Sequence, residues 1–490
     1  MGKLFFERLR KAPTFLLLLS VLGSFALPDP GPFQIITPVL ADDDDDDGDD
    51  DHDDDDDDDD NDRGRGSRGY DGSSSSPVYR AARPPRFLRE LIRPFRNRPA
   101  APPRRAAPPP PPEPRYAEHQ IVAMGLSDEH LAQLEADDYV VLQQSELSLI
   151  GQSIVKLEVP SGTDLETARE DVRVLDPTSQ ADFNHYYRPE QADVQARICP
   201  DGLCWAPLLI KWPVRDAGAR QACDTAVRIG MIDTGINPEH KTFAESAIDV
   251  MRIADEEEPA SGRQHGTAVA ALLVGSQASR SPGLLSDAKL FAVDAFQRAS
   301  SGRDRAEVFD LVVGIDHLLA HDVSIINMSL AGDANDLLRD SIESAVAENK
   351  VIFVAAVGND GPRAEPVYPA AYPEVIAVTA VDRHKRPYRR AVQGEHVDLA
   401  SPGVDVWTAA SISGARPKTG TSFATPFVSA AAAVVKAEEP ALSPEEVEQR
   451  LASMAEDLGE PGKDPVFGWG LLNASKVCGL VDENKPIVMD

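Results

Sequence analysis

From Val227 to Glu438 the sequence alternates short, continuous apolar runs with longer stretches of helical spacing. Apolar runs that lack a polar alternation are typical of strands buried on both faces. The alternation therefore predicts an α/β fold, a mainly parallel sheet with helices on both faces. The expected strands are 227–232, 289–293, 323–328, 351–356 and 375–380, and the expected helices are 266–275, 305–321, 336–349 and 421–438.

A smaller folded unit is expected before this region, at residues 118–190. Strand-like patterns occur at 119–124, 139–143, 153–159 and 181–187, and helical patterns occur at 128–135 and at 164–172 after Thr163, a candidate N-cap. The order β-α-β-β-α-β is that of a small α+β ferredoxin-like sandwich, with helices on one face of an antiparallel sheet.

The first 41 residues read as a signal peptide. Lys3, Arg8, Arg10 and Lys11 precede an apolar stretch of 14 residues, 14–27. This is shorter than the roughly 20 residues that a membrane-spanning helix needs. Cleavage sites are offered at 39–41 and at 24–26, and an uncleaved anchor is the alternative. The protein is expected to be secreted or periplasmic, without stable membrane insertion after signal cleavage.

Residues 42–62 contain 18 aspartates, and without them the net charge falls from −32 to −14. Such a tract cannot bury apolar surface, so we expect disorder. Residues 63–117 change to an Arg/Pro-rich linker. The tract is a solvated tail or, alternatively, folds back on these arginines or binds calcium loosely. The acidic balance argues against nucleic acid as a partner, because phosphates would be repelled.

Four cysteines occur, Cys199, Cys204, Cys223 and Cys478. In an oxidising compartment they predict two disulfide bonds with three possible pairings, and four free thiols are the alternative. No Cys/His spacing suggests zinc. The main domain is expected to span residues 199–480.

Three motifs that could carry catalytic chemistry lie at strand ends and helix starts of that domain. Asp233 ends an apolar strand in an Asp-Thr-Gly triplet, and His265 opens a helix in His-Gly-Thr. Ser422 lies in Gly-Thr-Ser-Phe-Ala-Thr-Pro, at a helix N-terminus that favours developing negative charge. Each of the first two motifs alone is common in turns or caps. The third, with its glycine, serine and proline together, is harder to explain by packing alone.

A fourth motif, Gly358-Asn359-Asp360-Gly361, follows an apolar strand. The amide of Asn359 could donate a hydrogen bond to an oxyanion beside the sheet. With these four motifs in this order, residues 205–478 resemble the subtilisin family of serine peptidases (S8 type). The segments 326–330, 368–378 and 400–403 agree with the resemblance.

The resemblance implies roles for these residues. Ser422 would be the nucleophile, His265 the general base and Asp233 the residue that orients the imidazole. Asn359 and the Ser422 backbone N–H would form the oxyanion hole. An extended protein or peptide substrate would pair with Ser329, Leu330, Ala331 and Gly332. The implied activity is hydrolysis by a serine endopeptidase through an acyl-enzyme.

The pocket for the residue before the cut would be walled by 331–332 and by Ala356, Val357 and Gly358. Val367 stands where family members often carry glycine, so we expect a shallow pocket that prefers small or medium apolar residues. Asp333 and Asp360 could instead favour basic residues. No cofactor is required. Calcium stays possible, but residues 275–286 lack the family's asparagine-rich calcium loop.

The 118–190 unit resembles the family's N-terminal prodomain, a folding template and intramolecular inhibitor. The resemblance places its last strand in the active site, with a cut between about Tyr187 and Cys204, or none. Two alternatives remain open. One is an inactive scaffold that binds peptides, which is disfavoured because no expected catalytic residue is missing. The other is an acidic adhesin or cation-binding protein whose Asp tract is the functional part.

Overall fold

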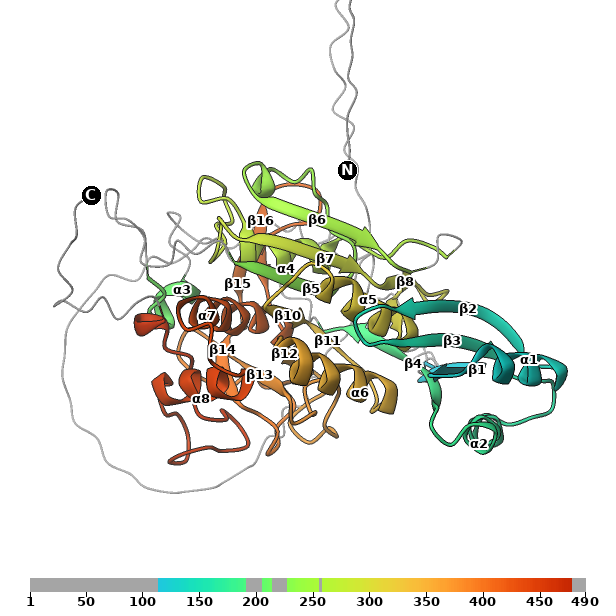
Figure 1. The fold of residues 1–490 in the computed structure, drawn as a ribbon. Coiled ribbons are helices and arrows are strands. Elements are labelled where there is room, and N and C mark those ends of the chain that lie inside the picture. The colour runs from blue at the N-terminus through green and yellow to red at the C-terminus, as the bar shows by residue number, and fades with distance from the viewer. Residues whose placement is uncertain (1–112, 191–204, 214–226, 255–257, 478–490) are drawn as a thin grey trace, which may run out of the picture. The chain divides into compact units, whose positions relative to one another are not determined.

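The computed structural model describes residues 113–190, 205–213, 227–254 and 258–477 (Figure 1). All of them lie within one unit of the chain, 106–490. The predicted signal peptide, the acidic tract, nearly all of the linker and the four cysteines lie outside the described residues. The predictions made for those segments, including disorder and disulfide bonds, therefore stay predictions.

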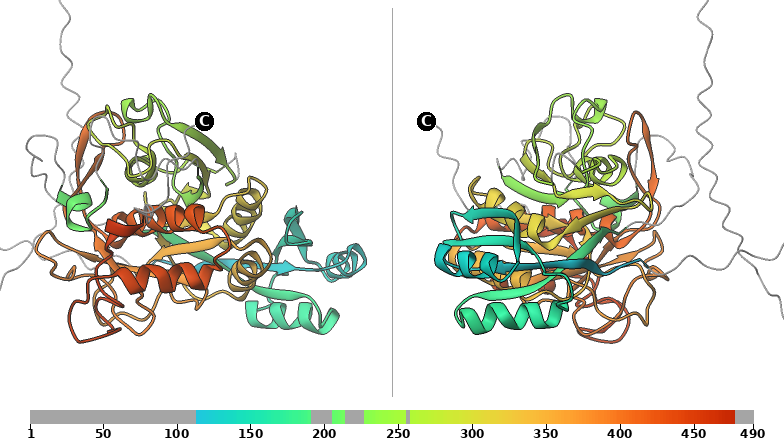
Figure 2. Two further views of the ribbon diagram at one scale, coloured as in Figure 1. Left: turned by 60° about the vertical axis from the view of Figure 1, so that its left-hand side comes forward. Right: turned by 90° about the vertical axis from the view of Figure 1, so that its right-hand side faces the viewer.

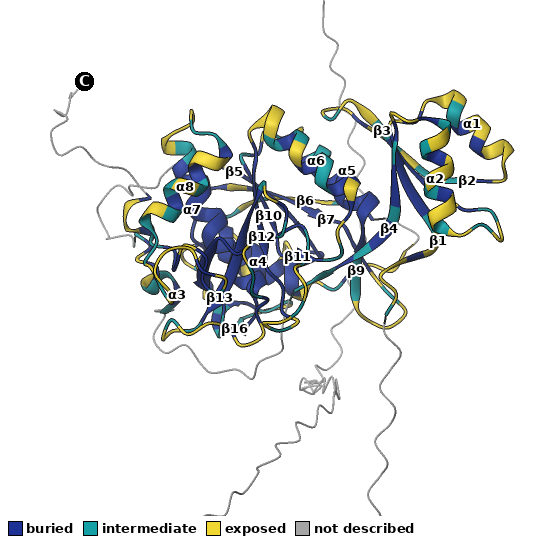
Figure 3. Cartoon of the chain, turned by 90° about the horizontal axis from the view of Figure 1, so that it is seen from below, coloured by how far each residue is buried: buried dark blue, intermediate teal, exposed yellow. Residues whose placement is uncertain are grey.

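The centre of the described structure is a parallel sheet of seven strands, in the order β14-β13-β12-β10-β5-β7-β6. Every neighbouring pair in it is parallel, which confirms the predicted fold class. Its interior strands are buried because their apolar runs have no polar face (Figure 3). The strands are β5 (Arg228–Asp233), β6 (Ala247–Arg252), β7 (Lys289–Asp294), β10 (Ile325–Met328), β12 (Ile352–Ala356), β13 (Val375–Val381) and β14 (Leu399–Pro402).

Helices cover the sheet in two groups (Figures 1 and 2). One group consists of α4 (Gln264–Val274) and α7 (Thr425–Glu438), with α8 (Pro444–Met454) packed on α7. The other consists of α5 (Val308–Leu319) and α6 (Asp336–Ser344). Nearly every residue of α4 and α7 is buried, because the side chains of both helices are small or apolar on all faces. Short elements complete this part: α3 (Trp205–Leu209), a π-helical turn at Ala345–Asn349, and 3-10 turns at Lys241–Phe243, Thr421–Phe423 and Ala474–Lys476.

Several elements were not predicted. Strand β6 was missed because it is an edge strand with mostly exposed side chains. The helix predicted from residue 305 begins at Val308, because residues before it form β9 (Asp304–Glu307), which pairs with β8 (Phe296–Arg298). The hairpin of β15 (Val406–Ala409) and β16 (Ala415–Lys418) was also missed.

The N-terminal unit, residues 113–190, has the predicted β-α-β-β-α-β order. Its strands form an antiparallel sheet in the order β2-β3-β1-β4, and its helices pack on a separate apolar cluster. The N-cap of α2 is Asp164 rather than Thr163, because the Asp164 carboxylate accepts the N–H of Thr167 at 3.0 Å. The elements are β1 (Tyr116–Met124), α1 (Asp128–Ala136), β2 (Val140–Leu147), β3 (Gln152–Glu158), α2 (Leu165–Leu175) and β4 (Gln180–Pro189).

Strand β4 connects the two parts of the structure. It pairs with β1 on one side, and further along it pairs with β9 and with β11 (Leu330–Ala331). The antiparallel sheet of the N-terminal unit therefore continues through β4 into β9 and β8. These two strands belong to the C-terminal part, residues 205–477, which contains the candidate catalytic residues. Figure 1 shows β4 reaching from the N-terminal sheet toward β11.

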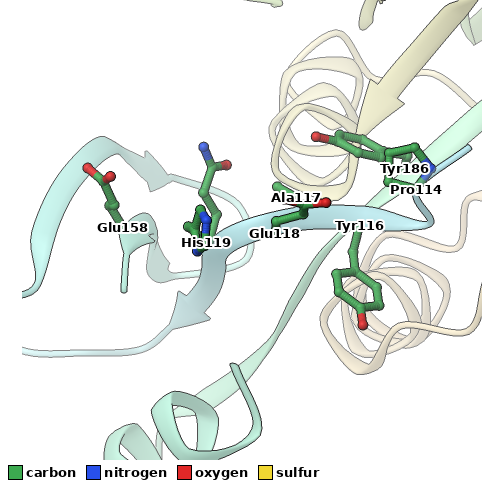
Figure 4. Close-up of a pocket in the computed structure, with 8 residues that line it drawn as sticks. Pro114, Tyr116, Ala117, Glu118, His119, Glu158 and Tyr186 are labelled. Atoms are coloured by element: carbon green, nitrogen blue, oxygen red, sulfur yellow. The ribbon is translucent and has the colours of Figure 1, made fainter. Parts of the chain in front are cut away.

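Two further observations concern surfaces. A pocket beside β1 is lined by Tyr116, His119, Glu158 and Tyr186 among others (Figure 4). None of the candidate catalytic residues lines it.

Among the described helices, none combines the length and the apolar character needed to cross a bilayer.

Candidate active site

Asp233 and His265 are joined by a short hydrogen bond. Asp233 is the last residue of β5, and its Oδ1 lies 2.6 Å from Nδ1 of His265, the second residue of α4. The same oxygen accepts the backbone N–H of Thr234 at 2.7 Å. Both side chains are almost fully buried, at 1% and 2% exposure. A buried carboxylate on Nδ1 holds the ring in place and leaves Nε2 free for chemistry.

The backbone around this pair explains why the two residues meet. Gly266 donates its N–H to Oγ1 of Thr234 at 2.9 Å. A Cβ at Gly266 would lie 2.2 Å from the carbonyl oxygen of Thr234, so a larger residue cannot fit. The first turn of α4 thus packs directly against the loop that follows Asp233.

Ser422 lies in the 3-10 turn that immediately precedes α7 and is fully buried. Its Oγ contacts two backbone carbonyl oxygens, that of Glu190 and that of Ser329, the latter at 3.2 Å. Nε2 of His265 is buried and makes no hydrogen bond within the described residues. The expected bond between His265 and Ser422 is therefore not formed in this state. Catalytic hydrogen bonds are often loose before the reacting complex forms.

Asn359 is oriented for donation. Its Oδ1 accepts the backbone N–H of Thr421 at 3.0 Å and the Thr421 hydroxyl at 3.2 Å. These two bonds fix which end of the amide is oxygen and direct Nδ2 away from Thr421. Nδ2 is buried and makes no hydrogen bond of ordinary geometry among the described residues, although it lies close enough to the Glu190 carboxyl group to lower the pKa of that group. Such a donor, held by the residue next to the candidate nucleophile, can stabilise an oxyanion.

A chain of hydrogen bonds ties the serine turn to the sheet. Ser429 in α7 donates to Oδ1 of Asn327 at 2.9 Å, and Nδ2 of Asn327 donates to Oγ of Ser329 at 3.0 Å. Ser329 in turn donates to the carbonyl oxygen of Ser422 at 2.9 Å. All four residues are fully buried. This network fixes Ser422 relative to the end of β10.

The end of β4 pairs with the segment that was predicted to bind the substrate. Leu330 pairs with Pro189 and Ala331 pairs with Arg188 in antiparallel register. The N–H of Glu190 approaches the carbonyl oxygen of Ser329 at 3.4 Å. The backbone of Gly332 pairs with that of Tyr368, and the described contacts include no pairing of Gly332 with β4. Its role toward a substrate stays a prediction.

Tyr187 fills a second position along this strand. Its side chain is fully buried, and its hydroxyl donates to the carbonyl oxygen of Asp333 at 2.9 Å. A Cβ at Gly332 would lie 2.5 Å from the Tyr187 ring, so this glycine makes room for the aromatic side chain. Burial raises the pKa of Tyr187 well above its usual value, which keeps the hydroxyl protonated as a donor.

Several residues were predicted to form the walls of the pocket for the side chain before the cut, and among them residues 356–358 lie near Val367. Ala356 ends β12, and Val357 belongs to the main apolar core. Gly358 has a φ of +96°, and a Cβ there would lie 2.9 Å from Cγ2 of Val367. Val367 therefore packs directly behind Gly358. Its effect on the depth of a substrate pocket stays a prediction.

Glu190 has an unusual environment for an acid. Burial, and next the charge of Asp360, raise the pKa of its carboxyl group to about 7, although the Asn359 backbone N–H and amide act in the opposite direction. Sequence reasoning missed this residue, since a Pro-Glu pair suggests an exposed loop. It also missed Thr234 and Thr421, whose hydroxyls give no signal apart from their neighbours' motifs.

Within the described residues, no group of three or more His, Cys, Asp or Glu side chains is arranged to hold a metal ion. The possibility of calcium elsewhere in the chain stays open.

Comparison with known proteins agrees with this geometry. The model of the subtilase family, Peptidase_S8, matches residues 224–470. The chain belongs to the subtilase family. It is therefore a subtilisin-like serine endopeptidase, a hydrolase that acts on peptide bonds and whose family needs no cofactor for catalysis.

The subtilase is similar to several bacterial proteases. It is 32% identical over 252 residues to subtilisin DY of Bacillus licheniformis, covering 50% of this chain and 89% of that protein. It is 28% identical over 284 residues to the minor extracellular protease Epr of Bacillus subtilis (strain 168), covering 56% of this chain but 43% of that protein.

Among solved structures, fervidolysin from Fervidobacterium pennivorans, a keratinolytic enzyme related to subtilisin, shares the fold with a TM-score of 0.62 and 20% identity. The match covers 75% of this chain and 62% of the fervidolysin chain. The subtilase thus spans less than two thirds of Epr and of fervidolysin.

Proposed function

We propose that this subtilase is an exported precursor that cuts its own chain after Glu190, with residues 113–190 acting as the intramolecular inhibitor until they leave. One observation carries the proposal: β4 lies antiparallel on β11, and its continuation brings the Glu190 carbonyl oxygen against Oγ of Ser422. The residue that precedes the cut would then be Glu190, and the bond broken would join Glu190 to Gln191.

The proposed reaction uses Ser422, His265, Asp233 and Asn359. Oγ of Ser422 attacks the carbonyl carbon of Glu190 while its proton passes to Nε2 of His265. Asp233 stabilises the imidazolium through Nδ1, and Nδ2 of Asn359 with the Ser422 N–H stabilises the oxyanion. His265 then protonates the amine of residue 191, which leaves. Water cleaves the ester, with His265 first accepting and then returning a proton.

One rearrangement is needed before this step. The Ser422 hydroxyl now faces the carbonyl oxygens of Glu190 and Ser329 rather than His265. A turn about its Cα–Cβ bond would bring Oγ toward Nε2, which has no competing partner among the described residues. The buried network behind Ser422 can keep the backbone in place during that turn.

External substrates would bind as β4 does, as an extended strand added between β9 and β11. A buried aromatic residue at the position of Tyr187 fits the space beside Gly332. The precursor's own residue before the cut is acidic, unlike the small or medium apolar residues expected from Val367. That preference for external substrates stays a prediction.

Export is proposed from the N-terminal sequence, where four basic residues precede an apolar stretch, and one relative is named as extracellular. The protein would then act in the periplasm or outside the cell. Peptides and proteins would be its substrates, and its own N-terminal unit its inhibitor.

The test is expression of the full chain beside Ser422→Ala, with intact-mass measurement of the products. We expect a new N-terminus at Gln191 in the parent, and none in Ser422→Ala. Ser453→Ala, at an exposed serine of α8, is the matched control and should be cut like the parent. If the parent neither cuts itself nor digests casein, the proposal fails and a peptide-binding scaffold is favoured. Cutting at another bond would refute the assignment of Glu190.

A further inference from the structure

Glu307 forms a buried ion pair with the N-terminal unit. It is the last residue of β9, and its Oε2 lies 2.5 Å from Nζ of Lys156 in β3. The two side chains are 9% and 11% exposed. Oε2 also accepts from Nδ2 of Asn184 at 2.9 Å, and Oε1 accepts from Nε2 of Gln297 at 3.2 Å. Of these three donors, only Gln297 belongs to the catalytic part.

The pair lies beside the groove that β4 occupies. Glu307 pairs through its backbone with Tyr186, four residues before Glu190. Lys156 also lies over the ring of Phe309 in α5, 5.2 Å from its centroid. Docking of the N-terminal unit therefore delivers an ammonium group into a site formed by β9 and the start of α5.

Several other contacts on this surface have the same electrostatic pattern, whereas Asp182 and Glu113 of the N-terminal unit accept from Asp336 N–H and Arg303 in the opposite sense. Carboxylates of the catalytic part accept from the N-terminal unit at several points. Asp316 accepts the Leu149 N–H at 2.9 Å, Asp340 accepts from the Gln180 amide, and Asp333 lies 3.4 Å from Nε of Arg115. These other contacts are partly exposed, whereas the Lys156–Glu307 pair is nearly dry.

A dry ion pair contributes more to specificity than to affinity. Water must be removed from both charges, so the net stabilisation of the correct pair is small. A partner that lacks the cation leaves the Glu307 carboxylate buried and uncompensated, which is strongly unfavourable. The pair therefore rejects wrong partners more than it tightens the right one.

We infer that Glu307 is the residue by which this subtilase recognises its own N-terminal unit, because it accepts only a unit that places a cation at the position of Lys156. The inference rests on the proposed function, in which that unit is the inhibitor. Units that carry a neutral or acidic residue there would dock poorly, and their catalytic parts would be inhibited less.

The experiment uses full-length chains that carry Ser422→Ala, so that none can cut itself. Four are compared: the parent, Lys156→Glu, Glu307→Lys, and the double reversal. Hydrogen exchange of the β4 and β9 amides reports undocking. Each single reversal should raise exchange about a hundredfold or more, since it leaves like charges buried together. The double reversal should return to within about tenfold of the parent.

Two additions keep the result interpretable. Lys385→Glu breaks another ion pair with an N–O distance of 2.5 Å, to Glu456, and should leave β4 exchange unchanged. Lys156→Met is measured alone and with Glu307→Gln, and the substitution should be much less harmful beside the neutral Gln. If the reversals disrupt folding, this second cycle decides the question.

Unchanged exchange in Lys156→Glu, or no coupling in the Met/Gln cycle, would overturn the inference. Neither outcome depends on cleavage after Glu190, since all of these chains lack the nucleophile. The chain with Ser422 intact is incubated in parallel. Its mass, measured by mass spectrometry, tests the proposed cut separately.

Discussion

Replacement of Glu190 by glutamine should remove a pH dependence from docking of the N-terminal unit. Burial and the nearby charge of Asp360 raise the pKa of the docked carboxyl group from 4.5 to about 7. The docked state therefore binds the proton more tightly than the undocked state does. Docking is strongest below pH 4.5, weakens as the pH rises toward 7, and stays constant above that.

The size of the effect follows from the shift. A displacement from 4.5 to about 7 corresponds to about 3 kcal/mol, or about 300-fold in the docking equilibrium. Glu190 keeps partial contact with solvent, so this value is an upper bound. The other titratable groups that face it are Asp360, His265 and Tyr388.

The measurement compares Ser422→Ala with Ser422→Ala/Glu190→Gln from pH 4 to 9. Hydrogen exchange of β4 amides is expressed as the ratio of the two chains, because the ratio cancels the intrinsic pH dependence of exchange. The chain with Glu190 should exchange progressively faster than the Gln variant between pH 4.5 and 7. A flat ratio would refute the reasoning, as would a transition in the opposite direction. A pH dependence retained by the Gln variant would show that the proton is not bound by Glu190.

Two further predictions concern catalysis and packing. Asn359→Ala should lower kcat on a peptide substrate about 10²–10³-fold with little change in KM, because Nδ2 acts on the oxyanion and not on the bound peptide; an equal rise in KM would contradict this. Gly266→Ala should lower the melting temperature of the Ser422→Ala chain, since the new Cβ would lie 2.2 Å from the Thr234 carbonyl oxygen; an unchanged melting temperature would show that the α4 start can shift.

The central sheet could be predicted from sequence because its signal is local. The runs that became β5, β7, β10, β12 and β13 are apolar throughout and lie between helical stretches. Strand β6 lacks that signal, because most of its side chains are exposed at the sheet edge. Strands β9 and β11 are short, and although β9 also pairs with the nearby β8, both strands pair with β4, which lies more than a hundred residues earlier.

The candidate site divides in the same way. Asp233, His265, Asn359 and Ser422 each lie in a motif with a distinctive neighbour, so their positions could be predicted. The direction of the Ser422 hydroxyl could not, because it depends on the carbonyl oxygens of Glu190 and Ser329. The importance of Glu190 and Glu307 was also hidden, since an acid's burial depends on what packs over it and not on its own sequence.

Strand β4 makes cleavage and activation separate steps. Hydrogen bonds run without interruption from β2 of the N-terminal unit through β4 to β9 and β8. A cut after Glu190 frees the end of β4 but breaks none of these pairs. The buried Tyr187 side chain and the Lys156–Glu307 pair would also stay in place. We therefore expect the cut chain to remain inhibited until β4 leaves the groove, and the rate of that departure, rather than the rate of cleavage, should set when activity appears.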